Sequence, residues 1–310
     1  MGILSSIGLS FCTAYLIPYT ASLYPPVKTF RIKAPAKLNI RLKVTGRRPD
    51  GYHELVSIMI PIDLFDLLEL TVDPGEGIKL VCEGTQLPND ESNLAFRAAQ
   101  SFFSRTGIRE AVSIKLIKNV PVAAGMGGGS SDAAATLLAL NEMWSRPLSL
   151  PEMHDLAIGL GADVPFFLEG KPCLAQGIGE ILEPLDSWPK CWFVIVRPPI
   201  EVSTSWVYSN LKFVLTTDEY DNIKQTLSHV PISIPQILEN DLERVTSATF
   251  PIVETIKKSL IQAGAQGALM TGSGPSVFGV FPSLDEALFG KKELVSQNLG
   301  AVFMATTWSG

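Results

Sequence analysis

The chain has little of what cysteine-based metal centres require. Its 310 residues include four cysteines and three histidines, and the cysteines are scattered at positions 12, 82, 173 and 191. No CxxC pair occurs, and no histidine lies near a cysteine at metal-ligand spacing. We therefore expect separate, buried thiols in a reducing compartment.

The chain also lacks an excess of positive charge. Its formal net charge is −6 at pH 7. Nucleic-acid binding depends on a basic surface that neutralises phosphates, so this balance argues against a nucleic-acid partner. An anionic ligand would need a local site instead of a field that covers the whole molecule.

Charge is absent altogether from the first 27 residues, Met1 to Val27. A secretory signal would begin with basic residues, and a transit peptide would contain arginines. A membrane helix would need about 20 apolar residues in succession, and prolines and polar residues interrupt this segment. We interpret residues 1–28 as an extension outside the fold, or as a start codon placed upstream, and not as a membrane anchor. The missing basic residues favour a bacterial cytoplasm over a plastid.

What remains has the composition of a folded protein, with 46% hydrophobic and 18% charged residues. Its length suggests two domains with a cleft between them. Turn and breaker residues gather at Pro184, Ser187 and Pro189, directly before a new apolar strand. We therefore expect one domain over residues 29–187 and a second over residues 188–310.

Alternation and capping signals predict the elements of the first domain. Residues 37–44 alternate strictly between polar and apolar as a half-buried strand, and strands are also expected at 52–60, 67–72 and 112–116. Asn93 can cap a helix that Gly107 ends, and residues 149–152 form a capping box that opens another. The run 133–144 is apolar on most sides, which predicts a buried helix.

Strands and helices also mix in the second half. Strands are expected at 191–196, 267–270, 276–281 and 301–306, and helices at 251–263 and 284–297. Hairpin-like strand pairs between helices favour an α+β sandwich over a doubly wound parallel sheet.

The sharpest motif is a glycine-rich loop between a strand and the buried helix. Four glycines occur in five residues of the stretch Pro121-Val122-Ala123-Ala124-Gly125-Met126-Gly127-Gly128-Gly129-Ser130-Ser131-Asp132. Backbone N–H groups of such a loop can cradle phosphate, with the helix dipole behind them. The loop is neither a Walker A sequence nor a dinucleotide fingerprint, and protein-kinase signatures are missing. A flexible connector is the alternative interpretation.

Lys37 and Asp163 supply the pair of charges that phosphoryl transfer needs. A carboxylate on a loop after a helix can accept the proton of an attacking hydroxyl group. A lysine on the polar face of a strand can keep that carboxylate ionised and stabilise developing negative charge. A surface salt bridge would be the plainer interpretation.

Three motifs in this order resemble those of the GHMP kinase family. They are Ala34–Asn39, the glycine-rich loop, and Met270–Ser276. The resemblance implies the two-domain α+β fold of that family, with an N-terminal domain like domain 2 of ribosomal protein S5 and a ferredoxin-like C-terminal domain. It further implies ATP as phosphoryl donor, Mg²⁺, Asp163 as general base and Lys37 as its electrostatic partner.

Five stretches resemble one branch of that family, whose small-molecule substrate carries cytidine diphosphate. They are Pro35–Asn39, Arg48–His53, Gly127–Ala134, Gly161–Phe166 and Gly177–Glu180, and the similarity extends from Thr29 to about Gly310. The branch implies phosphorylation of an alcohol in isoprenoid precursor synthesis. The alternatives are another GHMP kinase, of the homoserine or mevalonate type, and a catalytically silent sensor with the same fold. A monomer or a homodimer fits equally well.

The resemblance also assigns the binding residues. Tyr52 would stack on cytosine and His53 would hydrogen-bond its edge, while Tyr208 forms a second aromatic wall and Thr204 and Asn39 touch the substrate. From spacing alone, Tyr52 and His53 could equally be structural strand residues. For ATP the residues are Asn93, Lys118, Pro121, Val122, Ala123, Ala124, Gly125, Met126, Gly127, Gly128, Gly129, Ser130, Ser131, Gly272 and Ser273, with Ser131 as a magnesium ligand. A helix cap and a solvated charge are the alternatives for Asn93 and Lys118.

Overall fold

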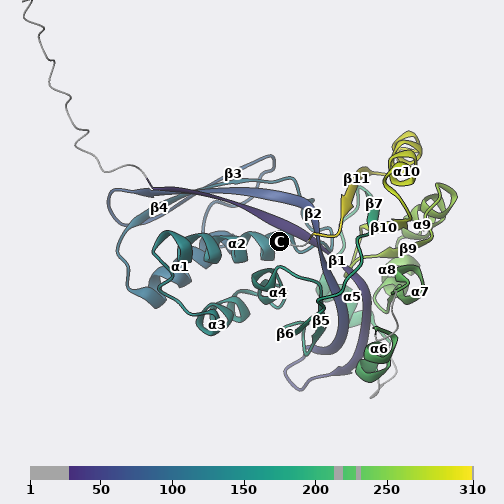
Figure 1. The fold of residues 1–310 in the computed structure, drawn as a ribbon, viewed down its shortest axis with the longest axis horizontal. Helices are drawn as coiled ribbons and strands as arrows, with labels where there is room; N and C mark the ends of the chain where they lie inside the picture. Colours follow the sequence, from purple (N-terminus) through teal and green to yellow (C-terminus); the bar gives the residue numbers. More distant parts are fainter. Residues whose placement is uncertain (1–27, 213–218, 228–231, 309–310) are drawn as a thin grey trace, which may run out of the picture.

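The computed structural model of the chain describes residues 28–212, 219–227 and 232–308. Cys12 and nearly all of the predicted extension lie outside the described residues. Two sheets form the framework, and Figure 1 shows them side by side along the longest axis. Strands and helices mix in both halves, which confirms the predicted α+β class.

The first sheet has seven strands. Five of them have the order β3-β4-β2-β1-β8, and the other two, β5 and β6, form a hairpin that pairs with β2. Helices cover one face of this sheet (Figure 1). The strands are β1 (Thr29–Arg47), β2 (His53–Asp73), β3 (Gly77–Glu83), β4 (Ala111–Ile117), β5 (Cys173–Gln176), β6 (Ile181–Pro184) and β8 (Glu239–Asn240). The helices are α1 (Leu94–Thr106), α2 (Gly128–Met143), α3 (Leu150–Leu160) and α4 (Val164–Glu169).

The long hairpin of β1 and β2 carries the site and differs from the prediction. The separate strands expected at 52–60 and 67–72 are one strand, because β2 continues through residues 61–66 with register shifts that bend the pair. Both faces of β1 are covered at its centre, so Lys37 and Asn39 are buried as well as Leu38 and Ile40. The expectation of a half-buried strand was therefore wrong for this stretch.

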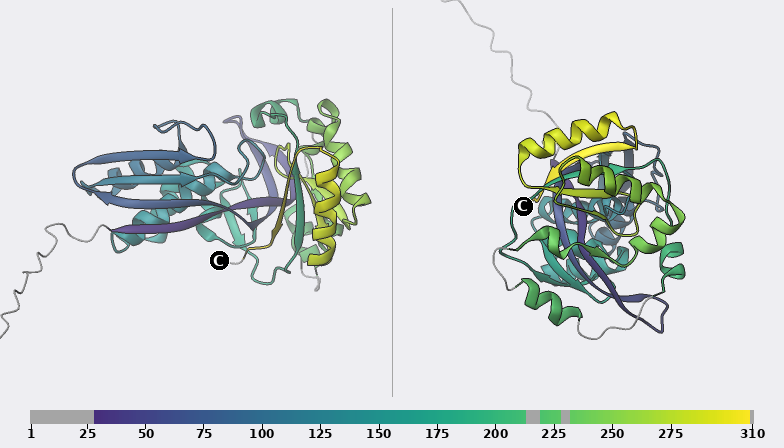
Figure 2. Two further views of the ribbon diagram at one scale, coloured as in Figure 1. Left: turned by 90° about the horizontal axis from the view of Figure 1, so that it is seen from above. Right: turned by 90° about the vertical axis from the view of Figure 1, so that its right-hand side faces the viewer.

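The apolar face of β1 packs against the second sheet. Leu38 and Ile40 belong to a core cluster with Phe193 and Phe278 of that sheet. Since neighbouring strand residues point to opposite faces, this packing directs Lys37 and Asn39 the other way. In Figure 2, the long β1–β2 hairpin extends from the helix-covered part of the first sheet to lie beside the second sheet.

Helix starts follow the predicted capping signals. The Asn93 side chain accepts a hydrogen bond from Ala95 N, and α1 ends at Gly107 in the left-handed region. The predicted capping box at Ser149 is present. The helix α2 begins at Gly128, five residues before the expected start. Half of the glycine run thus forms the first turn of the helix.

The second sheet has the order β11-β7-β10-β9. Its strands are β7 (Trp192–Arg197), β9 (Gly267–Met270), β10 (Val277–Phe281) and β11 (Ala301–Thr306), within one residue of the prediction. Six helices of the described residues accompany it: α5 (Thr204–Asn210), α6 (Glu219–Leu227), α7 (Ile234–Ile237), α8 (Glu243–Thr249), α9 (Ile252–Gln262) and α10 (Leu284–Ser296). Strand β8 lies in this half of the sequence but pairs with β1. The division of the chain between residues 187 and 188 stays a prediction.

None of the described helices has the length and apolar character needed to cross a bilayer.

Candidate active site

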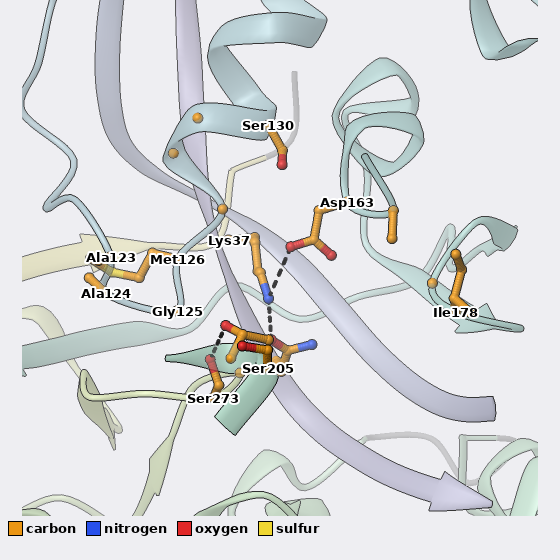
Figure 3. Close-up of a pocket in the computed structure, with 18 of the residues that line it drawn as sticks. Lys37, Ala123, Ala124, Gly125, Met126, Ser130, Asp163, Ile178, Ser205 and Ser273 are labelled. Atoms are coloured by element: carbon orange, nitrogen blue, oxygen red, sulfur yellow. Dashed lines mark hydrogen bonds and ion pairs between the residues drawn. The ribbon is translucent and has the colours of Figure 1, made fainter. Parts of the chain in front are cut away.

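A cavity of about 1070 Å³ lies where the glycine-rich loop, β1, the tip of the β1–β2 hairpin and α5 meet. Its lining contains every residue predicted to bind ATP or substrate except Ser131. Residues far apart in the sequence, such as Lys37, Asp163 and Ser273, are thus brought together, as Figure 3 shows. Their individual roles stay predictions.

Lys37 and Asp163 face each other inside this cavity (Figure 3). Lys37 Nζ lies 3.7 Å from Asp163 Oδ2, and the side chains are 5% and 36% exposed. The ammonium group also donates to Asn39 Oδ1, and Asn39 Nδ2 donates to Ser57 Oγ over 2.8 Å. A buried lysine held on one side therefore presents its charge to a carboxylate that solvent or a ligand can reach.

The local sequence explains why the Asp163 carboxylate is available. Helix α3 ends at Gly161, and Pro165 near the start of α4 favours a new helix directly after the break. Asp163 occupies the cap position of α4, yet its side chain makes no capping hydrogen bond. Its oxygens are left for the cavity, where a reacting hydroxyl group could approach them.

The glycine-rich loop is held at its centre by backbone contacts. Gly125 has a φ of 75°, and a Cβ atom there would lie 2.3 Å from the carbonyl oxygen of Thr271. The carbonyl group of Met126 accepts a hydrogen bond from Lys37 N over 3.0 Å. Only glycine fits Gly125 without displacing a neighbouring backbone. The loop is therefore pinned in place, which argues against a flexible connector.

Thr271, in the third motif, connects the glycine-rich loop to β1. Its Oγ1 accepts a hydrogen bond from Asn39 N over 3.0 Å and donates to Gly125 O over 3.4 Å. Asn240 holds the same turn, because its Nδ2 donates to the carbonyl groups of Met270 and Gly272 over 2.7 and 2.8 Å. Sequence reasoning missed both residues. Thr271 lies within a recognised motif, whereas no signal marks Asn240.

Lys118 lies between two buried carboxylates. Its Nζ donates to Asp132 Oδ2 over 2.7 Å and also to Asp66 Oδ2. Asp66 Oδ1 accepts hydrogen bonds from the backbone N–H groups of Asn119 and Val120, which lead into the glycine-rich loop. Lys118 is therefore part of a buried network and is no solvated charge. Sequence reasoning missed Asp66 and Asp132, since the network joins three separate segments.

Burial and charge shift the pKa values of this network. Burial raises the pKa of Asp132 to about 7 against the lowering effect of the Lys118 ammonium group, and Asp66 adds to the rise. Burial acts to lower the pKa of Lys118, but the two carboxylates outweigh it and the net shift is upward. One ammonium group thus pairs with two carboxylates, and Asp132 is the carboxyl group whose pKa is raised.

Asn93 caps a helix and also lines the cavity. Its side chain caps α1 and donates to Pro88 O over 3.0 Å, and the residue lines the cavity beside Lys118. The cap fixes the orientation of the amide group. Contact with adenosine stays a prediction.

Aromatic residues gather at the other end of the cavity, around the hairpin tip. The rings of His53 and Tyr208 stack with centroids 5.0 Å apart, and Tyr52 is 59% exposed. Burial and the nearby Arg47 charge lower the pKa of His53, and burial raises the pKa of Tyr208. The face of the His53 ring therefore packs against the ring of Tyr208, whereas the prediction for His53 concerned only a hydrogen bond to the edge of cytosine. An exposed tyrosine beside this pair provides a flat surface for a base.

Ser130 and Ser131 differ in what they can reach. Ser130 lines the cavity at the start of α2 (Figure 3), whereas Ser131 is 1% exposed and does not line it. Within the part of the chain that the structure describes, no three His, Cys, Asp or Glu side chains form a group that could hold a metal ion. A cation here would be bound chiefly by phosphate oxygens, with a serine hydroxyl group as the protein's share. Magnesium at Ser131 stays a prediction.

Family models match both halves of the chain. The model described as GHMP kinases N terminal domain matches residues 93–171, and the model described as GHMP kinases C terminal matches residues 222–299. Solved structures agree with this fold. The chain is similar to homoserine kinase from Cytophaga hutchinsonii (TM-score 0.73, 20% identity, covering 93% of this chain and 97% of that one). Together with the glycine-rich loop, these matches define a GHMP kinase.

Relatives with higher sequence identity indicate one family among the GHMP kinases. A 4-diphosphocytidyl-2-C-methyl-D-erythritol kinase from Geobacter metallireducens is 46% identical over 263 residues, which cover 84% of this chain and 92% of that protein. The enzyme of the same name from Syntrophotalea carbinolica is 46% identical over 266 residues, covering 86% and 94%. A crystal structure of 4-(cytidine 5'-diphospho)-2C-methyl-D-erythritol kinase matches with a TM-score of 0.75 at 35% identity, covering 91% and 100%. The chain belongs to this family of kinases.

Proposed function

We propose that the chain transfers the γ-phosphoryl group of ATP to the 2-hydroxyl group of 4-diphosphocytidyl-2-C-methyl-D-erythritol. The products are the 2-phosphate and ADP, in the non-mevalonate route to isoprenoid precursors. Relatives named for this activity support the proposal over most of the chain. The observation that carries it is one cavity lined by both the Lys37–Asp163 pair and the aromatic cluster of Tyr52, His53 and Tyr208.

In this mechanism Asp163 accepts the proton of the 2-hydroxyl group as its oxygen attacks the γ-phosphorus atom. The bond from that phosphorus to the bridging oxygen breaks, and ADP leaves with the electron pair. Lys37 stabilises the negative charge that develops during the transfer. The geometry supports these roles, since Lys37 is fixed by Asn39 and Asp163 faces the cavity.

The glycine-rich loop and α2 would hold the phosphates of ATP. Gly125 and Gly127 adopt positive φ angles, and Gly127 directly precedes the helix, so backbone N–H groups and the dipole of α2 face the same place. Magnesium, when bound, neutralises phosphate charge. Ser130 or the predicted Ser131 would supply a hydroxyl ligand, and Ser130 is the one that lines the cavity.

We also propose that the enzyme acts on this small molecule in the bacterial cytoplasm, without nucleic-acid or membrane partners. The net charge of −6 argues against a nucleic-acid partner, and the bacterial origin of its relatives supports the location. Whether the active form is a monomer or a homodimer stays open between the two predicted states.

The competing functions are other GHMP kinases and a silent sensor. Similarity to homoserine kinase and to Leishmania major mevalonate kinase, at 20% and 17% identity, concerns the fold alone. A sensor would have no need of a base, so the facing Lys37 and Asp163 argue against it.

The test is a comparison of acceptors. The purified enzyme would be given ATP and magnesium with the cytidylylated substrate, homoserine or mevalonate, and ADP release would be followed together with the phosphorus spectrum of the product. We expect turnover with the cytidylylated substrate alone, and inhibition of it by CDP. Turnover with homoserine or mevalonate, or no turnover with any of the three, would contradict the proposal.

A further inference from the structure

Three lysine and arginine residues line the cavity in the described part of the chain: Lys37, Arg47 and Lys118. Two of them are already engaged with carboxylates. Lys37 faces Asp163, and Lys118 binds Asp66 and Asp132. Their charges are therefore largely balanced before any ligand enters.

Arg47 differs from both. No carboxylate of the described residues lies within ion-pair distance of its guanidinium group, and the residue is exposed. Arg47 is the last residue of β1 and lies directly opposite His53 on β2. Directly opposite residues of an antiparallel pair share a face, and the Arg47 charge lowers the pKa of His53. A cation without a carboxylate partner among the described residues thus lies beside the aromatic end of the cavity.

The adjacent Arg48 differs from Arg47, because its side chain lies near carboxylates. Arg48 contacts three carboxylates: Asp50 at 3.1 Å, Glu54 at 3.6 Å and Glu180 at 4.0 Å. Arg48 also bonds across the turn, where its backbone N–H donates to Tyr52 O over 2.7 Å. Arg48 therefore holds the hairpin tip together through both its side chain and its backbone.

The chemistry of the substrate identifies a partner for Arg47. The diphosphate group of the cytidylylated substrate is attached to the cytidine and joins it to the acceptor alcohol, so it must begin at the aromatic end, which Arg47 also lines. A guanidinium group binds phosphate oxygens through two parallel hydrogen bonds. We propose that Arg47 binds the diphosphate group of the substrate and sets the preference for a cytidine diphosphate over cytidine itself. This inference rests on the function proposed above.

The experiment compares Arg47→Gln and Arg47→Lys with Arg109→Gln, which removes the same charge from an exposed position outside the cavity. Calorimetry with CDP and with cytidine would report the diphosphate contact directly. Steady-state kinetics would give kcat and KM for the substrate and KM for ATP. Thermal melting would check that each variant is folded.

We expect Arg47→Gln to weaken CDP binding about 10- to 100-fold, the range for losing hydrogen bonds between charged groups. Cytidine affinity, kcat and KM for ATP should change less than about 2-fold, since these contacts lie elsewhere. The substrate KM should rise with the loss of CDP affinity. Arg47→Lys should recover part of it, because the charge remains and the paired geometry does not. Arg109→Gln should behave as wild type.

Other outcomes overturn the inference. Equal weakening of CDP and cytidine would mean that Arg47 supports the base pocket, and unchanged CDP binding would mean that it contacts only solvent. A similar loss in Arg109→Gln would point to long-range attraction instead of a contact. A wild-type enzyme that neither binds CDP nor phosphorylates the cytidylylated substrate would instead refute the function itself.

Discussion

The two ends of the cavity are built in opposite ways. At the end with the glycine-rich loop, Lys118 and Asp132 are nearly inaccessible and bonded to each other. At the hairpin tip, Tyr52 is 59% exposed and Arg47 has no carboxylate partner among the described residues. The side chains at the glycine-rich loop are bonded to each other before a ligand binds. Those at the hairpin tip are available to contact a ligand. Substitutions should therefore affect rate and stability at the first end and substrate KM at the second.

The largest effect should come from the reaction centre, where the preorganised end meets the substrate. Asp163→Asn removes the proton acceptor, so turnover should fall by at least about 100-fold while the affinity for a non-hydrolysable ATP analogue stays nearly constant. Steady-state kinetics and calorimetry measure the two quantities. Asp155→Asn, on the exposed side of α3, is the matched control and should keep full activity.

Lys37→Ala should resemble Asp163→Asn, and the double variant should lose much less than the product of the two single losses if the pair acts as a unit. Near-normal turnover of Asp163→Asn would falsify the assignment of the base. Losses that multiply would indicate independent roles for the two residues.

The next largest effect should be on stability. Lys118→Met leaves two buried carboxylates facing each other without a cation, so the free energy of unfolding should fall by about 3–5 kcal/mol. Lys115→Met, on β4 just before Lys118, removes an exposed pair with Glu83 and should cost at most about 1 kcal/mol. Urea denaturation measures both. Equal, small losses would show that the buried network contributes nothing that an exposed pair does not.

Substitutions at the hairpin-tip end of the cavity should weaken substrate binding. Tyr52→Ala removes the exposed ring, and loss of stacking should cost about 1–3 kcal/mol of substrate binding, seen in substrate KM with little change in KM for ATP. His53→Ala should bring a comparable loss and relax discrimination against uridine analogues. Phe289→Ala, an exposed aromatic on α10, is the control. An unchanged substrate KM in both variants would place the cytidine pocket elsewhere.

The smallest effect concerns pH. Because the pKa of Asp132 is raised to about 7 from an ordinary value near 3.8, the folded state binds a proton more readily than the unfolded state between these values. Its contribution to stability is therefore present at low pH and is lost as pH rises toward 7. Asp132→Asn should remove this slope, so that its stability relative to wild type improves by about 1.4 kcal/mol between pH 6 and pH 8. A constant difference across that range would contradict the raised pKa.

Local signals predicted much of this molecule. Asn93, Gly107 and Ser149 mark helix ends through capping chemistry that depends on neighbouring residues, and these positions were correct. Alternation found the strands of the second sheet within one residue. Motifs indicated many of the residues that line the cavity. Each motif is a short stretch of sequence, although the cavity combines several such stretches.

Features that depend on distant contacts were missed. The union of two predicted strands into β2 follows from its pairing with β1, which extends across both of them. The buried network around Lys118 joins Asp66 and Asp132, which lie in separate segments without a shared pattern. Ser131 is buried and does not line the cavity, and its predicted role as a magnesium ligand stays a prediction.

The most direct test of the division between the two ends uses the acceptor with and without its cytidine monophosphate. We would measure kcat/KM of the wild-type enzyme for the cytidylylated substrate and for 2-C-methylerythritol 4-phosphate under the same conditions. If the hairpin-tip end binds cytidine and thereby positions the hydroxyl group at Lys37 and Asp163, the truncated acceptor should be used at least about 100-fold less efficiently. Equal kcat/KM for the two acceptors would contradict a role of the hairpin-tip end in selecting the substrate.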